Sequence, residues 1–348
     1  MDALSSQAIG IDLTASVVSL VDGAPSILTL PRRGSQSSLP SLPSGPFAPL
    51  QHRTLELALR GFVEEQTGYR LGYIEQLYTF ADRGRHATVP SSSPHVVSIG
   101  YVALTRFGIE NDVPLGSDET ALAWHRWYEY FPWEDWRSGK PKILDSVILP
   151  ALADWLASDP ADQPPGRIRS RKERVAFAFG GADLNAVAFN NGSASAARLD
   201  SWDDERVLER YELLYEAGLI GEAHLDGRAR HVSQMDLLGK AMALDHRRIL
   251  ATAIARLRGK MKYRPVVFEL MPAAFTLTEL QRAVEAISGR LLHKQNFRRL
   301  VERGGLVEPT GSSTLATGGR PAALYRFHRE VISERPSAGL RFGQPVVR

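Results

Sequence analysis

Apolar residues recur at helical spacing in the last third of the chain. The first set shares one helix face and comprises Leu277, Leu280, Val284 and Ile287. Thr276 and Glu279 have capping-box spacing, so this helix is expected to begin at Thr276. Gly289 then supplies a stop, because glycine tolerates the left-handed conformation of a C-cap.

A second amphipathic pattern follows near Lys294 and ends at Gly304. Its apolar stripe comprises Phe297, Leu300 and Val301. Two strand patterns come next, at 306–308 and 322–327, joined by a glycine-rich loop, 317–321. Two helices followed by a two-stranded hairpin is the order of a winged helix-turn-helix.

The polar face of the second helix has the residue types that read DNA. Arg bridges guanine acceptors in the major groove, and Gln or Asn recognises adenine. Arg320, at the tip of the hairpin loop, is expected to reach a phosphate or the minor groove. The candidate DNA-contacting residues are Thr278, Lys294, Gln295, Asn296, Arg298, Arg299 and Arg320. The alternative is a solvated face, which is the usual role of a charged helix surface.

The charge distribution favours DNA binding over a merely solvated face. Residues 256–348 contain 17 Lys and Arg against 7 Asp and Glu, a net charge of +10. The whole chain carries +3, which leaves −7 for the rest. A basic segment joined to an acidic one indicates a phosphate-binding domain attached to a domain with another task.

Strand and helix patterns both occur through the rest of the chain. Expected strands cover 8–20, 26–30, 73–80 and 95–105, and expected helices cover 50–66, 143–157, 207–217 and 245–258. Asp22-Gly23 is expected to turn the first two strands, and Gly68 to stop the first helix. Residues 160–174 are expected to form a linker, and 175–199 either strands or a mobile loop.

Composition sets the outer limits. The chain has 348 residues, 43% of them hydrophobic, and no cysteine. That length suffices for two or more buried cores, and the lack of cysteine excludes disulfides, thiolate zinc sites and cysteine nucleophiles. No segment has about 18 uninterrupted apolar residues, and the first residues lack the pattern of a signal peptide. We therefore expect a soluble, cytoplasmic protein with no membrane partner.

Several phrases of the sequence resemble a known group of regulators. The C-terminal phrases, within 244–327, are LDHRRILATAIARLRGKMKYRPVVFELMP, FTLTELQRAVEAI, NFRR and GRPAALYRF. They are similar to the linker helix and winged helix of the Nudix-related transcriptional regulators, the NrtR group. The N-terminal phrases EEQTGYRLGYIEQLYTFADRGR, VVSIGYVAL and YFPWEDWRSGKP resemble the branch of that group described as NAD regulators, NadQ.

The resemblance implies a Nudix-like α/β/α sandwich followed by a winged helix-turn-helix. The implied boundaries are 1–258 for a ligand-sensing domain with an insertion around 142–235, 259–330 for the DNA-binding domain and 331–348 for a tail. The resemblance also implies a homodimer that binds double-stranded operator DNA and represses NAD biosynthesis genes. The implied effector is an NAD-related metabolite or an adenine nucleotide, and no cofactor is expected.

Enzyme activity is not carried over by the resemblance, because the Nudix signature is degenerate. That signature places carboxylates on one helix face to hold the divalent ions that activate water on a pyrophosphate. When Gly68 is aligned with the terminal glycine of the signature, Phe62 and Gln66 occupy carboxylate positions and Glu65 alone is retained. The other departures are Phe47, Arg53 and Gly61. We therefore expect the protein not to be an enzyme.

What remains of this domain is expected to be an effector pocket. Arg83 and Arg85 would hold phosphates, and Trp133 or Trp136 would stack on an adenine or nicotinamide ring. The alternative is that the tryptophans pack in the core and the arginines are solvated. No metal site is supported, because the histidines are scattered without paired spacing on one helix.

Two further functional classes stay open from the sequence. One is a Nudix-type pyrophosphohydrolase with non-standard metal ligands and an accessory basic domain. The other is a DNA-binding scaffold without a ligand.

Overall fold

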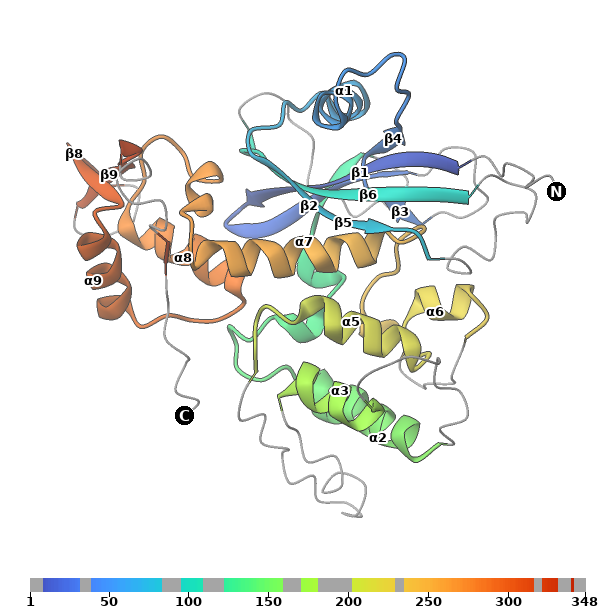
Figure 1. The fold of residues 1–348 in the computed structure, drawn as a ribbon. Helices are drawn as coiled ribbons and strands as arrows, with labels where there is room; N and C mark the ends of the chain where they lie inside the picture. Colours follow the sequence, from blue (N-terminus) through green and yellow to red (C-terminus); the bar gives the residue numbers. More distant parts are fainter. Residues whose placement is uncertain are drawn as a thin grey trace.

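The computed structural model describes residues 9–31, 39–82, 95–108, 122–158, 170–180, 202–228, 235–315, 321–330 and 339–340. A mixed sheet forms the N-terminal part, with helices on both of its faces and a small C-terminal domain beside it (Figure 1). This arrangement confirms the expected α/β class.

The sheet has seven strands in the described part of the chain, in the order β3-β2-β1-β6-β5, with β4 added to β1 and β7 to β2. The strands are β1 (Ile9–Val21), β2 (Ala24–Pro31), β3 (Pro40–Ser41), β4 (Ser44–Pro46), β5 (Ile74–Phe80), β6 (His95–Leu104) and β7 (Ala123–Arg126). The long strands β1 and β6 pair in parallel, with Ile9 opposite His95 and Val18 opposite Leu104. All other pairs in this sheet are antiparallel.

The turn between β1 and β2 is at Asp22 and Gly23, as expected. Both residues have positive φ angles, 51° and 73°. Two such residues make the tight hairpin turn whose twist matches that of the flanking strands.

Helix α1 (Leu55–Thr67) covers one face of the sheet and α7 (His246–Met261) the other (Figure 1). α1 starts later than the expected residue 50, because the Thr54 hydroxyl accepts from the Leu57 amide and caps the helix there. Gly68 ends α1 with φ 74°, as expected. We call β1–β7 with α1 and α7 the N-terminal sandwich.

Further helices pack on the outer side of α7. They are α2 (Leu149–Ala157), α3 (Arg171–Phe179), α5 (Val207–Glu216) and α6 (Gly221–Leu225), with short turns η1 (Trp127–Glu129), η2 (Pro132–Glu134), η5 (Met235–Leu238) and the π-turn η3 (Leu144–Ile148). The expectation of a linker up to residue 174 and of strands or a loop from 175 is wrong over α3. Ser170 and Glu173 form a complete capping box that starts this helix inside the expected linker.

The C-terminal domain consists of η6 (Val266–Glu269), α8 (Leu277–Ser288), α9 (Lys294–Gly304), β8 (Val307–Thr314) and β9 (Ala322–Phe327). The capping box of Thr276 and Glu279 and the Gly289 C-cap are confirmed. α9 ends at Gly304, as expected, with Gly305 as the left-handed cap. The first strand continues to Thr314, beyond the expected 306–308.

Leu340, within the expected tail, packs against the rest of the protein. Its side chain is fully buried, and its amide donates to the Met261 carbonyl at 2.7 Å.

Among the helices in the part of the chain that the structure describes, none combines the length and the apolar composition needed to cross a bilayer.

Candidate nucleic-acid interface

Helix α9 presents a polar face to solvent because its apolar stripe is narrow. Phe297 and Val301 are buried and Leu300 is half-buried against the core. The other side of the helix faces solvent, and its exposed side chains are Lys294, Gln295, Asn296, Arg298, Arg299, Glu302 and Arg303. All the candidate residues on α9 therefore lie together on one accessible surface, which we call the α9 face.

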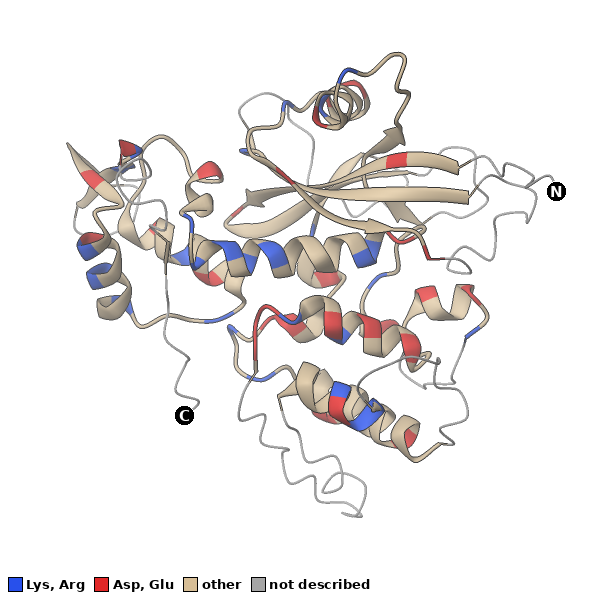
Figure 2. Ribbon diagram, viewed as in Figure 1, with Lys and Arg blue, Asp and Glu red and all other residues tan. Residues whose placement is uncertain are grey.

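The basic side chains of the α9 face are not neutralised by carboxylates. Within the described ranges, none of the four cations Lys294, Arg298, Arg299 and Arg303 forms an ion pair. Arg299 donates to the Asn296 side chain at 3.3 Å, and this neutral amide is its one partner among the residues that the structure describes. Figure 2 shows these cations along α9 at the edge of the molecule. Unpaired, solvated guanidinium groups on one helix are available to phosphates and base edges.

The hairpin of β8 and β9 is fixed firmly to the start of α8. Phe275 and Tyr325 exchange two backbone hydrogen bonds, at 2.9 and 2.8 Å. Phe268 and Phe327 stack with ring centroids 4.2 Å apart. These contacts hold the wing in a defined position relative to the helices.

Two other DNA-contact candidates differ from those on α9. Thr278 is half-buried in the first turn of α8. Arg320 lies outside the described residues. Arg303, which the sequence analysis did not select, joins the α9 face, and its spacing of four residues after Arg299 was the signal that could have found it.

The helix that aligns with the Nudix signature uses its substituted positions for packing. The Phe62 ring lies edge-on to His52, with centroids 5.1 Å apart, and covers Gly45. The Gln66 amide bonds to both backbone groups of Ser44, accepting at 3.3 Å and donating at 2.6 Å. Two positions that hold carboxylates in the Nudix signature therefore attach α1 to β4 in this protein.

The only carboxylate cluster of metal-ligand geometry in the described residues lies elsewhere. Asp203, Asp204 and Glu205 place ligand oxygens within 4.8 Å of one another. Lys262 pairs with two of them, Asp204 at 3.4 Å and Glu205 at 2.5 Å. These carboxylates are thus part of an ion-pair network, far in sequence from the signature helix.

Of the four expected effector residues, the structure describes Trp133 and Trp136, and the Trp136 indole donates to the Trp133 carbonyl at 3.1 Å. Trp133 is fully buried in the main core, which favours the alternative of core packing over ring stacking on a ligand. Trp136 is half-buried, and its ring lies 4.6 Å from that of Trp202. Arg83 and Arg85 lie outside the described residues. Effector contact by these four residues stays a prediction.

One cavity of about 440 Å³ opens beside α7, between β5 and α5. Its basic lining is largely neutralised, because Glu75 pairs with Arg256 at 3.1 Å and with Lys260 at 2.8 Å. The cavity is therefore a mixed-charge groove rather than a preformed phosphate site.

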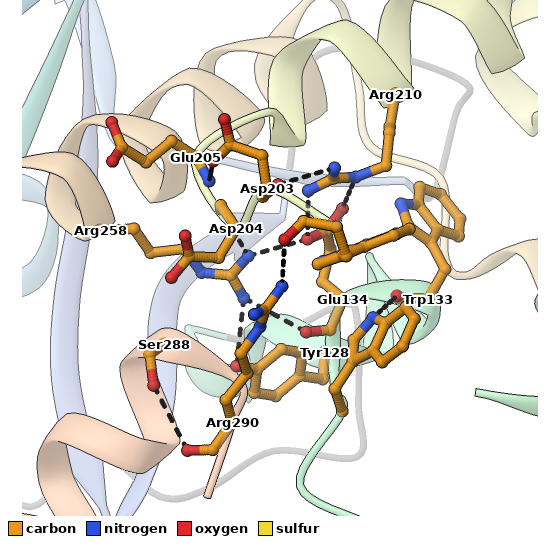
Figure 3. Close-up of polar contacts among 12 residues, drawn as sticks. Tyr128, Trp133, Glu134, Asp203, Asp204, Glu205, Arg210, Arg258, Ser288 and Arg290 are labelled. Carbon is orange, nitrogen blue, oxygen red and sulfur yellow. Dashed lines mark hydrogen bonds and ion pairs between the residues drawn. The ribbon is translucent and has the colours of Figure 1, made fainter. Parts of the chain in front are cut away.

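A buried charged group that the sequence did not predict joins α7 and α5 to the segment after β7 (Figure 3). The Glu134 carboxylate is 1% exposed and pairs with Arg210 at 2.6 Å and Arg258 at 2.8 Å. Burial alone lowers the pKa of the Arg258 guanidinium, but Tyr128 and Glu134 beside it outweigh that effect and raise the pKa. The one available signal was a glutamate within the aromatic run 124–136.

Fold and surface together define a winged-helix DNA-binding protein with an α/β sandwich. Comparison with known proteins narrows this class. Residues 267–327 match the NrtR DNA-binding winged helix domain. Over 86 residues, the chain is 49% identical to the ADPR responsive transcriptional repressor NtrR of Acinetobacter baylyi (strain ATCC 33305 / BD413 / ADP1). That match covers 25% of this chain and 34% of the repressor, so the chain aligns with only about a third of that relative.

Two solved structures share the fold over nearly the whole chain. Shewanella oneidensis NrtR complexed with a 27mer DNA gives a TM-score of 0.52 at 19% identity, covering 93% of this chain and 96% of that one. Shewanella oneidensis NrtR in a second structure gives 0.51 at 20% identity, covering 93% and 97%. The expected fold, a Nudix-like sandwich with a C-terminal winged helix, and the resemblance to the NrtR group are confirmed. The narrower resemblance to the NadQ branch stays a prediction.

Proposed function

We propose that the protein is a transcriptional repressor that binds operator DNA through the α9 face and responds to an NAD-derived nucleotide. The observation that carries this proposal is the set of unpaired cations on α9, presented by a domain that matches a DNA-binding family. The DNA contacts would come from Lys294, Gln295, Asn296, Arg298 and Arg299, with Thr278 at the start of α8 and Arg320 on the wing.

The proposed assembly is a homodimer. Helix-turn-helix proteins commonly bind as dimers whose recognition helices reach two half-sites about one helical turn apart. In this assembly residues 1–258 form the ligand-sensing part, with an insertion around 142–235, residues 259–330 form the DNA-binding domain and 331–348 the tail.

The proposed effector is ADP-ribose or a closely related nucleotide. The Acinetobacter baylyi relative is described as ADPR responsive, and ADP-ribose contains both the adenine and the pyrophosphate for which the sequence predicted partners. Arg83 and Arg85 would hold the pyrophosphate and Trp136 would contact a ring. NAD biosynthesis genes are the proposed targets.

We propose that the protein does not hydrolyse its effector. Phe62 and Gln66 leave Glu65 as the only carboxylate at the aligned metal positions, and one carboxylate is a poor substitute for the set that positions divalent ions. Incubation with Mg²⁺ or Mn²⁺ and either ADP-ribose or NADH is expected to give no pyrophosphatase turnover. Metal-dependent turnover that is abolished by Glu65→Gln would establish the hydrolase alternative instead.

The DNA-binding proposal is tested by selecting bound sequences from random double-stranded DNA. The expected result is enrichment of a sequence with two related half-sites whose centres are about 10 base pairs, or a multiple of that, apart. Arg298→Ala/Arg299→Ala is the negative control and is expected to abolish enrichment. If the wild-type protein enriches no sequence, specific DNA recognition is refuted.

A further inference from the structure

The carboxyl end of α8 is held by groups that lie outside the winged helix. The Tyr128 hydroxyl donates to the Ala286 carbonyl at 2.7 Å, and Arg258 Nε donates to the Ile287 carbonyl at 3.0 Å. The Trp136 amide donates to the Gly289 carbonyl at 2.7 Å. The last carbonyls of a helix have no partner within it, and their partial negative charge favours a cation nearby. Helix α8 therefore ends against α7 and the segment that follows β7.

Glu134 fixes the position of Arg258 in this contact (Figure 3). Its two carboxylate oxygens accept from Arg258 at 2.8 Å and from Arg210, on α5, at 2.6 and 2.9 Å. All three side chains are fully buried. A buried charge is tolerated only when it is paired in good geometry. Displacing any one of the three side chains would therefore leave an unpaired charge in the protein interior.

The fit around the end of α8 is close. Gly289 has φ 73°, and a Cβ atom at this position would lie 2.4 Å from the Glu134 carbonyl oxygen. Only four residues separate Gly289 from Lys294, where α9 begins. A displacement of the segment that carries Glu134 is therefore transmitted to the start of the DNA-facing helix through a short connection.

We propose that Tyr128, Glu134 and Arg258 form a joint that sets the orientation of α8 and α9 and transmits the effector signal to the α9 face. We call these three residues the Glu134 joint. The transmission of an effector signal rests on the proposed function. The role of the three residues in orienting α8 and α9 does not. Tyr128 and Glu134 belong to the segment that follows β7 of the sheet, whereas Arg258 belongs to the helix that leads into the winged helix. All three act as positioning residues and none of them belongs to the α9 face.

The test uses Tyr128→Phe in the full-length protein, because this change removes one hydroxyl and keeps the ring and the buried charges. The matched control is Tyr215→Phe, which removes a hydroxyl that donates to Asp226 at 2.6 Å within the outer helices. The first measurement is hydrogen exchange of backbone amides in 285–293, without DNA or ligand. The Tyr128 hydroxyl donates to the Ala286 carbonyl and accepts from Arg258, so Tyr128→Phe loses both bonds. Exchange there is expected to become roughly fivefold faster in this variant. Tyr215→Phe is expected to match the wild type.

The second measurement is the ratio of operator affinities with and without ADP-ribose. In Tyr128→Phe this ratio is expected to move roughly fivefold toward one, while Tyr215→Phe keeps the wild-type ratio. A wild-type ratio of one overturns ADP-ribose control, which belongs to the proposed function, and the exchange measurement then still decides the joint. Exchange in 285–293 that is equal in Tyr128→Phe and wild type, or equally faster in both variants, overturns the joint.

Discussion

Two helices of this protein are rich in Lys and Arg, and their cations have opposite environments. On α7 the basic side chains face carboxylates from other elements. The pairs are Arg247 with Glu222, Arg248 with Asp82 and Glu212, Arg256 and Lys260 with Glu75, and Arg258 with Glu134. On α9, no cation forms an ion pair with any residue that the structure describes. One helix therefore uses its charge for internal attachment, and the other presents it to solvent.

The comparison shows that a charge count along the sequence differs from a charge on the surface. The +10 of residues 256–348 includes Arg256, Arg258 and Lys260. Glu75 and Glu134, from much earlier in the chain, form ion pairs with these three. The field that an approaching polyanion meets depends on the cations that no carboxylate pairs, and in the described part of the chain these include the four on α9.

The largest expected effect comes from breaking a buried pair on α7. Arg258→Ala leaves the Glu134 carboxylate buried beside a single arginine and is expected to reduce the free energy of unfolding by about 3–5 kcal/mol. Arg256→Ala, on the same helix, removes an ion pair at the surface and is expected to cost at most about 1 kcal/mol. Urea denaturation of both variants measures the difference. Equal losses would show that burial does not distinguish the two pairs.

For DNA affinity, substitutions on α9 are expected to have the larger effect and a substitution on α7 the smaller one. Arg298→Ala or Arg299→Ala is expected to weaken operator binding by about 1–3 kcal/mol where the side chain reads a base edge. Arg256→Ala is expected to leave operator binding unchanged, because this side chain is paired with Glu75 beside α7 and lies outside the α9 face. Fluorescence anisotropy at several salt concentrations measures both. A loss in Arg256→Ala as large as in the α9 variants would contradict the division between the helices.

The smallest expected effect sharpens the account of α7 through its pH dependence. Burial alone would raise the pKa of the Glu75 carboxyl, but hydrogen bonds from Lys260 and Tyr73 outweigh burial and lower the pKa below its usual 4.5. A carboxyl whose pKa is lowered on folding contributes stability above its unfolded pKa, and this contribution is lost as pH falls through the folded pKa. Glu75→Gln should therefore be less stable than wild type at pH 7, and the difference should shrink below about pH 4.5.

The control for this pH experiment is Glu65→Gln, on the exposed face of α1. Its stability is expected to follow that of the wild type through the same acid range. A stability difference for Glu75→Gln that stays constant from pH 7 to pH 3 would show that pairing with α7 does not depend on the Glu75 charge.

The elements that the sequence predicted well are those defined by local chemistry. The two ends of α8 are defined by Thr276 with Glu279 and by Gly289, because a cap needs only residues within one turn. Ser170 with Glu173 gave an equally local signal for α3, and it was overlooked in a stretch rich in proline and arginine. The polar face of α9 was likewise readable, because helical spacing separates it from Phe297 and Val301.

The parts that the sequence did not predict depend on distant partners. Glu134 contacts residues 76 and 124 positions away, so no spacing rule connects it with Arg210 or Arg258. Trp133 was selected for its ring chemistry, yet its burial depends on the packing of several elements. The same limit applies to β1 and β6, whose parallel pairing joins residues about 86 positions apart in sequence, as Ile9 and His95 show.

We propose that binding of a nucleotide by the N-terminal sandwich changes the DNA affinity of the α9 face. The direct test is calorimetric titration of ADP-ribose into the protein, alone and saturated with operator DNA. The two affinities are expected to differ by a coupling free energy of roughly 1–3 kcal/mol, and the same factor is expected when DNA is titrated with and without ADP-ribose. Equal ADP-ribose affinities in the free and DNA-bound protein would contradict the claim, however tightly the ligand binds.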